Sequence, residues 1–225
     1  AAGGVARVTA AHLPARSAGE AVAPITPAAN AGGWDAFVTS DTLPTEVVDG
    51  FVVSANERPP PSPVRIGAFF SPPDRAERLA RLLASRPRLT IDDLAAFQRD
   101  VHMATSAALN ALLVARGAAL GGLGWRAQNV LKAIAGWDGD YTAESRGAAA
   151  FELVLGRFAR DFLGPRRLAA YRAGWGWRRL LLEDLSGADR DLVADALRRA
   201  LNGASGRTPP AWGDIHRLRL RHPMH

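Results

Sequence analysis

The sequence predicts an α+β fold, with strands near both ends and a mostly helical segment between them. Residues 4–10 alternate along the chain in the manner of a strand. Residues 51–53 form a short, continuous apolar run, which is typical of a buried strand. From residue 74 onward the apolar residues recur mostly with helical spacing, and residues 212–220 again resemble a strand.

These patterns divide the chain into three regions of a single piece, residues 1–225. We expect strands and irregular loops over residues 1–73 and mainly helices over residues 74–204. Residues 205–225 are expected to form a C-terminal tail or a final strand.

The first region is rich in Ala, Gly and Pro. The pair Gly3-Gly4 predicts a hairpin turn, which would place another strand ahead of residue 1. Residues 13–44 are expected to be a long, mostly irregular surface segment. After the strand at 51–53, the prolines of residues 59–63 exclude helix, and residues 64–70 are predicted to form a second short strand.

The helical region has recognisable boundaries. A first helix is predicted over residues 74–86, and the capping box Thr90–Asp93 is expected to open a long helix that ends near Arg116. The glycines of residues 117–124 interrupt the helical pattern. Further helices are expected at residues 126–135, 146–163, 166–173, 177–184 and 188–202.

Composition excludes several classes of function. The chain has no cysteine, which excludes disulfides, thiolate catalysis and Cys-based zinc sites. The net charge is +6, and Lys132 is the only lysine among the 28 basic residues, a bias that fits genome composition. Paired arginines on amphipathic helices form a solvated face and few aromatic residues lie among them, so we expect no nucleic-acid partner. No apolar run reaches about 18 residues, so we expect no membrane span.

One segment resembles a metal-binding loop. Residues 138–144 begin with the Asp-x-Asp-x-Thr pattern of a calcium loop. Ala143 stands where the loop needs glycine, and Ala149 stands where it needs a bidentate glutamate. We therefore predict no metal and no cofactor, and expect Ser145 to cap the next helix.

Two polar residues suggest part of an active site. Asn56 follows the predicted strand at 51–53, where it either bonds its own turn or serves as a rigid hydrogen-bond donor. A fixed amide N–H aimed at a developing oxyanion contributes about 3–4 kcal/mol to catalysis. Arg75 lies at the start of a helix, where the helix dipole disfavours a cation, which indicates a local partner for it.

Several segments, in order, resemble the penicillin acylase (penicillin amidase) family of N-terminal-nucleophile hydrolases, and in particular the C-terminal part of its β subunit. The segments are Gly4–Arg16, Gly50–Pro59, Pro73–Arg78, Leu89–Val101, Trp137–Gly139 and Trp212–Arg217. The similarity extends over nearly all of the chain.

The resemblance implies a fragment of the αββα architecture and the chemistry of amide hydrolysis. In this family a precursor is cut into α and β subunits and exported to the periplasm or outside the cell. The new N-terminal Ser attacks the amide, and its own α-amino group acts as the base, since its pKa lies near 8. Carried over, Asn56 matches the oxyanion-hole donor, and Arg75 matches the arginine that helps to hold the site in place.

The sequence also departs from the family pattern. The family usually has a second Asn where this chain has Glu57, which introduces a carboxylate next to the donor. Residues 60–73 lack the Asp that contributes to the family's calcium site, so that site is not expected here. Ala1 is not the nucleophilic Ser. We expect the α subunit and the N-terminal half of the β subunit as partners, and no hydrolytic activity from this chain alone.

The resemblance implies a parent enzyme that cleaves a linear amide, whose substrate is the side chain of a β-lactam, an N-acyl-homoserine lactone or a related N-acyl compound. A periplasmic or secreted location is implied too, although the first residues have no signal-peptide pattern. The alternative is a non-catalytic helical interaction module derived from such an enzyme or similar to it. A reading frame upstream of Ala1 with a Gly-Ser processing junction would favour the enzyme.

Overall fold

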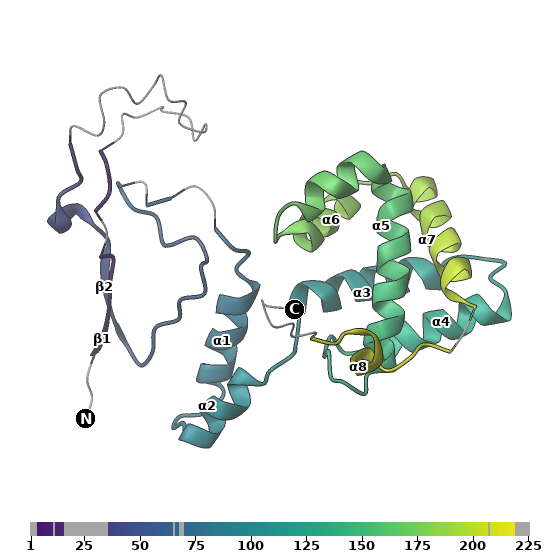
Figure 1. The fold of residues 1–225 in the computed structure, drawn as a ribbon, viewed down its shortest axis with the longest axis horizontal. Coiled ribbons are helices and arrows are strands. Elements are labelled where there is room, and N and C mark those ends of the chain that lie inside the picture. Colours follow the sequence, from purple (N-terminus) through teal and green to yellow (C-terminus); the bar gives the residue numbers. More distant parts are fainter. Residues whose placement is uncertain are drawn as a thin grey trace, which may run out of the picture. The chain divides into compact units, whose positions relative to one another are not determined.

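The computed structural model describes residues 4–10, 12–15, 36–64, 66–67, 70–206 and 208–218. The chain forms two compact units, Ala1–Arg88 and Leu89–His225 (Figure 1). The described part of the first unit contains a small sheet and one α-helix, and the second unit is helical.

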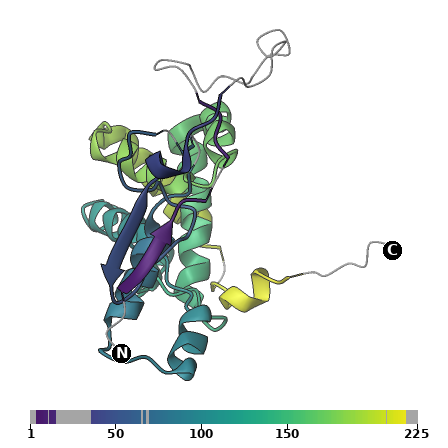
Figure 2. The same cartoon turned by 90° about the vertical axis from the view of Figure 1, so that its left-hand side faces the viewer.

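The N-terminal unit is built on a two-stranded antiparallel sheet. Strand β1 (Gly4–Val8) pairs with β2 (Thr45–Asp49), with Val5 opposite Val48 and Arg7 opposite Glu46 (Figure 2). Val8 and Val47 are 62% and 71% exposed. The prediction of a strand near residues 4–10 is confirmed, whereas the sheet alone is too small to be stable in water.

Two further strand predictions for this unit are not confirmed. The prediction of a strand at 51–53 is wrong, because β2 already ends at Asp49. Gly50 has a φ of 100°, which turns the chain out of the sheet. Phe51 is consequently 39% exposed. Of residues 64–70, the described ones (64, 66, 67 and 70) belong to no strand, and the others lie outside the described residues.

Other predictions concern residues that are only partly described. Gly4 is already the first residue of β1, and Gly3 lies outside the described residues. Most of the long segment predicted to be irregular lies outside them too. Its described C-terminal part contains a 3-10 turn, η2 (Ser40–Thr42), ahead of β2.

Helix α1 (Asp74–Ala84) confirms the predicted first helix. It follows Pro72-Pro73, and none of its residues is buried, although Leu79, Leu82 and Leu83 are partly covered. Leu43 is the buried hydrophobic residue of the described part of this unit. The described part of the N-terminal unit therefore has almost no core of its own.

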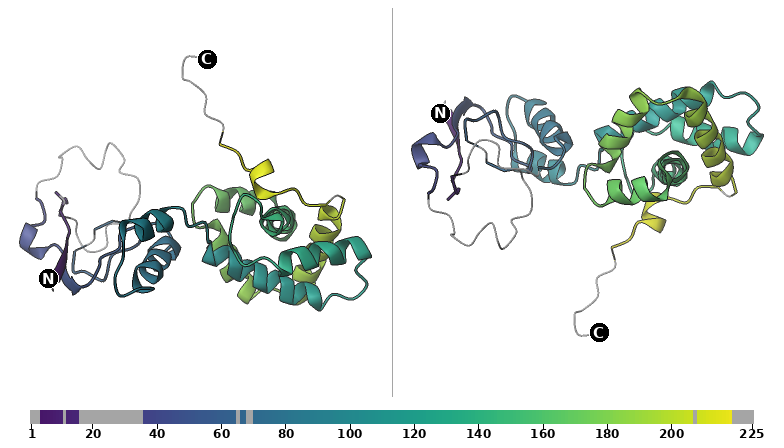
Figure 3. Two further views of the ribbon diagram at one scale, coloured as in Figure 1. Left: turned by 90° about the horizontal axis from the view of Figure 1, so that it is seen from below. Right: turned by 90° about the horizontal axis from the view of Figure 1, so that it is seen from above.

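The C-terminal unit has an extensive core around one long helix. Figure 3 shows α5 along its axis, with α4, α6 and α7 around it. Phe151, Leu155 and Phe158 of α5 are fully buried. The helices are α2 (Ile91–Gln98), α3 (Ala104–Ala118), α4 (Trp125–Ala135), α5 (Arg146–Arg172), α6 (Trp177–Ser186), α7 (Arg190–Ala204) and α8 (Trp212–Ile215). No helix in the described ranges is long and apolar enough to cross a membrane.

The helix boundaries confirm most of the predictions. The capping box is present, since Thr90 and Asp93 exchange side-chain and backbone hydrogen bonds at the start of α2. Ser145 caps α5 by accepting a hydrogen bond from the Ala148 N–H. The two helices predicted at 146–163 and 166–173 are joined in α5 across a kink at Gly164, where φ is 73°.

The prediction of a single helix from Thr90 to Arg116 is wrong, because an extended segment separates α2 from α3. In this segment His102 forms an antiparallel bridge with Asp140, and the Met103 N–H donates to the Gly139 carbonyl. These long-range backbone bonds replace the intrahelical bonds that a continuous helix would make.

For the C-terminal end the sequence predicted a tail or a final strand, and the described residues 208–218 contain no strand. Residues 212–215 form the short helix α8 instead. The backbone N–H groups of Trp212 and Gly213 donate to Ser145 and Ala143, and the Trp212 ring packs edge-on against Tyr141. These contacts hold the start of the tail on the helical unit, and residues 219–225 lie outside the described part.

The central position of α5 predicts a large effect of core truncation. We expect Leu155→Ala, at a fully buried position, to lower the free energy of unfolding by about 2–5 kcal/mol because it leaves a cavity. Leu180→Ala on α6, where the side chain is 44% exposed, is the matched control and should cost about 1 kcal/mol or less. Urea unfolding followed by far-UV circular dichroism measures both, and equal losses would contradict the assignment of α5 as the core helix.

Candidate functional site

Asn56 has an unusual backbone conformation. Its φ is 61°, in the left-handed region, and it is the one non-glycine residue with a positive φ among those described. Asn tolerates this region better than most residues, but the conformation still costs energy and persists only when its surroundings enforce it. The turn at Asn56 is therefore a place where the fold holds one residue in a defined geometry.

Three hydrogen bonds hold this turn. Arg75 Nη2 donates to the Ala55 carbonyl oxygen over 2.8 Å, and the Ser71 N–H donates to the Asn56 carbonyl over 2.7 Å. The Ala55 N–H donates to Oε2 of Glu57 over 2.6 Å. The peptide groups on both sides of Asn56 are thus held by residues from elsewhere in the unit.

The structure brings the two predicted site residues together. Arg75 lies in the first turn of α1, 20 residues after Ala55, and its guanidinium bonds the carbonyl of the peptide that leads into Asn56. The expectation of a local partner for this arginine is confirmed. The contact is to the backbone of the turn, and it fits a residue that positions Asn56 rather than one that reacts.

Glu57 lies beside the turn without a free carboxylate. One oxygen accepts the Ala55 N–H, and the other lies 4.0 Å from Nη1 of Arg7 on β1. Arg7 also pairs with Glu46 on β2 over 2.6 Å. The charge that departs from the family pattern is therefore engaged by the backbone and by a guanidinium.

The side-chain amide of Asn56 remains available. The residue is exposed, and its amide makes no hydrogen bond to any residue that the structure describes. An amide N–H stabilises negative charge but forms and breaks no covalent bond itself. The arrangement can therefore supply electrostatic stabilisation to an acyl-transfer reaction, whereas the nucleophile must come from another residue.

Sequence reasoning did not single out Ser71. Its backbone forms a parallel bridge with Glu57, and its hydroxyl oxygen is buried without a hydrogen bond to any described residue. The available signal was its position before Pro72-Pro73, which favours extended backbone that can pair with a neighbouring segment. Glu57 is recognisable in the sequence as a departure from the family pattern, but its hydrogen bond with the Ala55 N–H is not predictable from the sequence.

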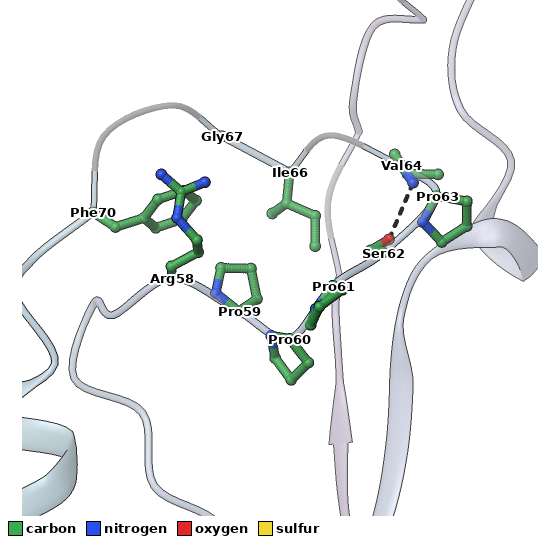
Figure 4. Close-up of a pocket in the computed structure, with 10 residues that line it drawn as sticks. All are labelled: Arg58, Pro59, Pro60, Pro61, Ser62, Pro63, Val64, Ile66, Gly67 and Phe70. Atoms are coloured by element: carbon green, nitrogen blue, oxygen red, sulfur yellow. Dashed lines mark hydrogen bonds between the residues drawn. The ribbon is translucent and has the colours of Figure 1, made fainter.

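A proline-rich loop next to the turn encloses an open hollow of about 300 Å³. In Figure 4 the guanidinium of Arg58 lies against the ring of Phe70, 4.9 Å from its centroid. The hollow is lined by Arg58, Pro59, Pro60, Pro61, Ser62, Pro63, Val64, Ile66, Gly67 and Phe70. Neither Asn56 nor Arg75 lines it, so it is separate from the hydrogen bonds of the turn.

No group of three or more His, Asp or Glu side chains suited to a metal occurs in the described ranges. The absence of the family calcium site stays a prediction.

A second polar cluster lies within the helical unit. Arg178 of α6 donates to both carboxylate oxygens of Glu152 on α5, over 2.8 and 3.0 Å, and to Ser106 Oγ on α3 over 3.1 Å. The Tyr141 hydroxyl donates to the same carboxylate. Because each charged group is paired and the cluster joins three helices, its role is structural.

Removing the arginine contact should loosen the Asn56 turn. We expect Arg75→Ala to speed hydrogen exchange at the Ala55 and Ser71 amides, since both N–H groups donate within the turn that Arg75 holds. Arg81→Ala is the matched control, because Arg81 lies on the same helix and, within the part of the chain that the structure describes, bonds only the Glu77 carbonyl, over 3.4 Å. Exchange that is unchanged in Arg75→Ala would contradict the assigned role of Arg75.

The phenol of Tyr141 should resist ionisation. Burial raises its pKa, the nearby Arg178 guanidinium opposes this, and the Glu152 carboxylate raises the pKa further. In a Tyr171→Phe variant, where Tyr141 is the remaining tyrosine, we expect no tyrosinate absorbance as the pH passes about 10, the ordinary pKa. The stabilisation from the neutral phenol is present below about pH 10 and is lost as the pH rises toward the folded pKa. A folded-state midpoint near 10 would contradict the burial of Tyr141.

Comparison with known proteins extends over the whole chain. Residues 1–225 match the model of the penicillin amidase family. No curated protein sequence matches the chain. The family match includes both compact units and the segments that carry Asn56 and Arg75. The chain therefore belongs to the penicillin amidase family, a family of amide hydrolases.

Proposed function

We propose that this chain supplies the oxyanion-hole side of an amidohydrolase active site, as the C-terminal part of a β subunit. Asn56 is the donor, and Arg75 is a positioning residue. The supporting observation is the contact between Arg75 and the Ala55 carbonyl at the left-handed Asn56, which joins two segments 20 residues apart around an uncommitted side-chain amide. Membership of an amide-hydrolase family supports the reaction class.

The proposed reaction is acyl transfer through a covalent intermediate. The hydroxyl oxygen of an N-terminal Ser, on polypeptide outside these residues, attacks the substrate carbonyl carbon while its own α-amino group takes the proton. The carbonyl oxygen becomes negative, and the Asn56 Nδ2–H donates to it together with a backbone N–H from the same outside region. The C–N bond then breaks, the amine leaves with a proton, and water hydrolyses the acyl-enzyme.

Arg75 contributes by fixing the donor. Its hydrogen bond to the Ala55 carbonyl restrains the peptide plane that precedes Asn56, and so limits rotation about the Asn56 φ angle. A donor that is already oriented needs no reorganisation when charge develops, which is the main source of oxyanion stabilisation. The positive charge of Arg75 also favours an anion nearby, although water screens it because the side chain is exposed.

The substrates and partners follow from the same proposal. The substrate is a linear amide, such as a β-lactam side chain, an N-acyl-homoserine lactone or a related N-acyl compound. The α subunit and the N-terminal half of the β subunit complete the site and cover the exposed valines of the sheet, Val8 and Val47. The resemblance to exported acylases supports a periplasmic or secreted location.

A second candidate is a non-catalytic helical interaction module. The observation that favours it is the buried core of the C-terminal unit, which depends on its own helices. This candidate assigns no function to the geometry of the Asn56 turn, so kinetics at that residue separate the two proposals.

The decisive variant is Asn56→Ala in the full-length, processed protein. We expect kcat for an N-acyl substrate to fall about 10²- to 10³-fold with KM changed little, because the interaction exists mainly in the transition state. Asn202→Ala, which removes another exposed asparagine, on α7, is the matched control and should leave both constants unchanged. Full activity in Asn56→Ala would contradict the oxyanion role.

A further inference from the structure

Glu57 lies where the family usually has a second asparagine, and its carboxylate connects the sheet to the Asn56 turn. We propose that Glu57, held by Arg7, is a positioning residue that keeps Asn56 in its left-handed conformation. The proposal rests on the oxyanion role of Asn56 and adds a residue that works through it.

Each oxygen of the Glu57 carboxylate makes a different interaction. Oε2 accepts the Ala55 N–H over 2.6 Å, and a hydrogen bond to a carboxylate is stronger than one between neutral groups. Oε1 faces Nη1 of Arg7 at 4.0 Å, where the attraction is between charges rather than through a hydrogen bond. The Glu57 side chain is 17% exposed, so solvent screens this pair less than a surface pair.

Ala55 is consequently held at both of its backbone polar groups. Its N–H is bound by Glu57 and its carbonyl oxygen by Arg75. The residue that follows, Asn56, has the strained φ of 61°. Because a left-handed non-glycine residue relaxes unless its neighbours enforce the conformation, the loss of one bond at Ala55 should let the Asn56 amide move.

Arg7 explains how a carboxylate can be tolerated beside an oxyanion donor. An isolated negative charge there would oppose the developing charge on the substrate. Arg7 lies between Glu57 and Glu46, at 4.0 Å and 2.6 Å from their carboxylate oxygens, and partly neutralises both. Since Arg7 and Glu46 are paired across β1 and β2, the same contacts connect the sheet to the turn.

The test compares two glutamates that share Arg7, in the full-length, processed enzyme with an N-acyl substrate. We expect Glu57→Ala to lower kcat about tenfold, a part of the loss from removing an oxyanion donor, with KM changed less than about twofold. Glu57→Gln keeps an acceptor for the Ala55 N–H and should restore most of the rate. Glu46→Gln removes the other partner of Arg7 but does not contact the turn, so it should match the wild type.

The double variant separates positioning from a merely structural role. If Glu57 acts through Asn56, Glu57→Ala should reduce kcat no further once Asn56 is Ala. Independent, multiplying losses would overturn the proposal. If Glu57→Ala does not fold, Arg7→Gln and Glu46→Gln decide, because Arg7→Gln removes the charge that holds Glu57 and should lower kcat: equal activities in these two variants would overturn the proposal.

The outcomes also distinguish the two proposals. Wild-type activity in Asn56→Ala would overturn the oxyanion role and this inference with it. An impaired Asn56→Ala together with a fully active Glu57→Ala would overturn only the role of Glu57.

Discussion

The hydrogen bond from Arg75 to the Ala55 carbonyl is the contact on which the candidate site depends. A cation in the first turn of a helix is disfavoured by the helix dipole, and here the guanidinium instead bonds a carbonyl outside the helix. Helix α1 therefore holds the Asn56 turn, and the position of α1 in the chain is set by Pro72-Pro73 ahead of it. The turn is organised mainly through the backbone, and the Asn56 side-chain amide makes no hydrogen bond to any described residue.

The two compact units differ in how they are stabilised. The C-terminal unit buries apolar residues of α3, α4, α6 and α7 together with those of α5, so packing within the unit offsets the entropy lost on folding. In its described part the N-terminal unit buries Leu43, exposes Val5, Val8 and Val47, and has a sheet of two strands. Such a unit gains stability when further apolar surface covers it, and the candidate site lies on this unit rather than on the helical one.

Local signals made most helices predictable from the sequence. The Thr90–Asp93 capping box, the Ser145 cap and the Gly117–Gly124 break act over a few residues, and the structure has all three. The failures have a common cause in longer-range structure. An apolar run such as Phe51–Val53 does not by itself distinguish a strand from a half-covered extended segment, and the break at His102 results from pairing with Asp140.

The candidate site likewise contains residues that could be predicted from the sequence and residues that could not. Asn56 and Arg75 could be predicted, because one resembles a family motif and the other occupies an unfavourable helix position. Ser71 could not, since its contribution is a backbone N–H that any residue but proline would supply. Glu57 could be recognised as a departure but not as a support, because its effect depends on Arg7, which lies 50 residues away in the chain. The effect of a substitution beside a hydrogen-bond donor therefore depends on the charged groups near it. Here the Arg7 guanidinium lies near the Glu57 carboxylate, and the carboxylate belongs to the turn because it accepts the Ala55 N–H.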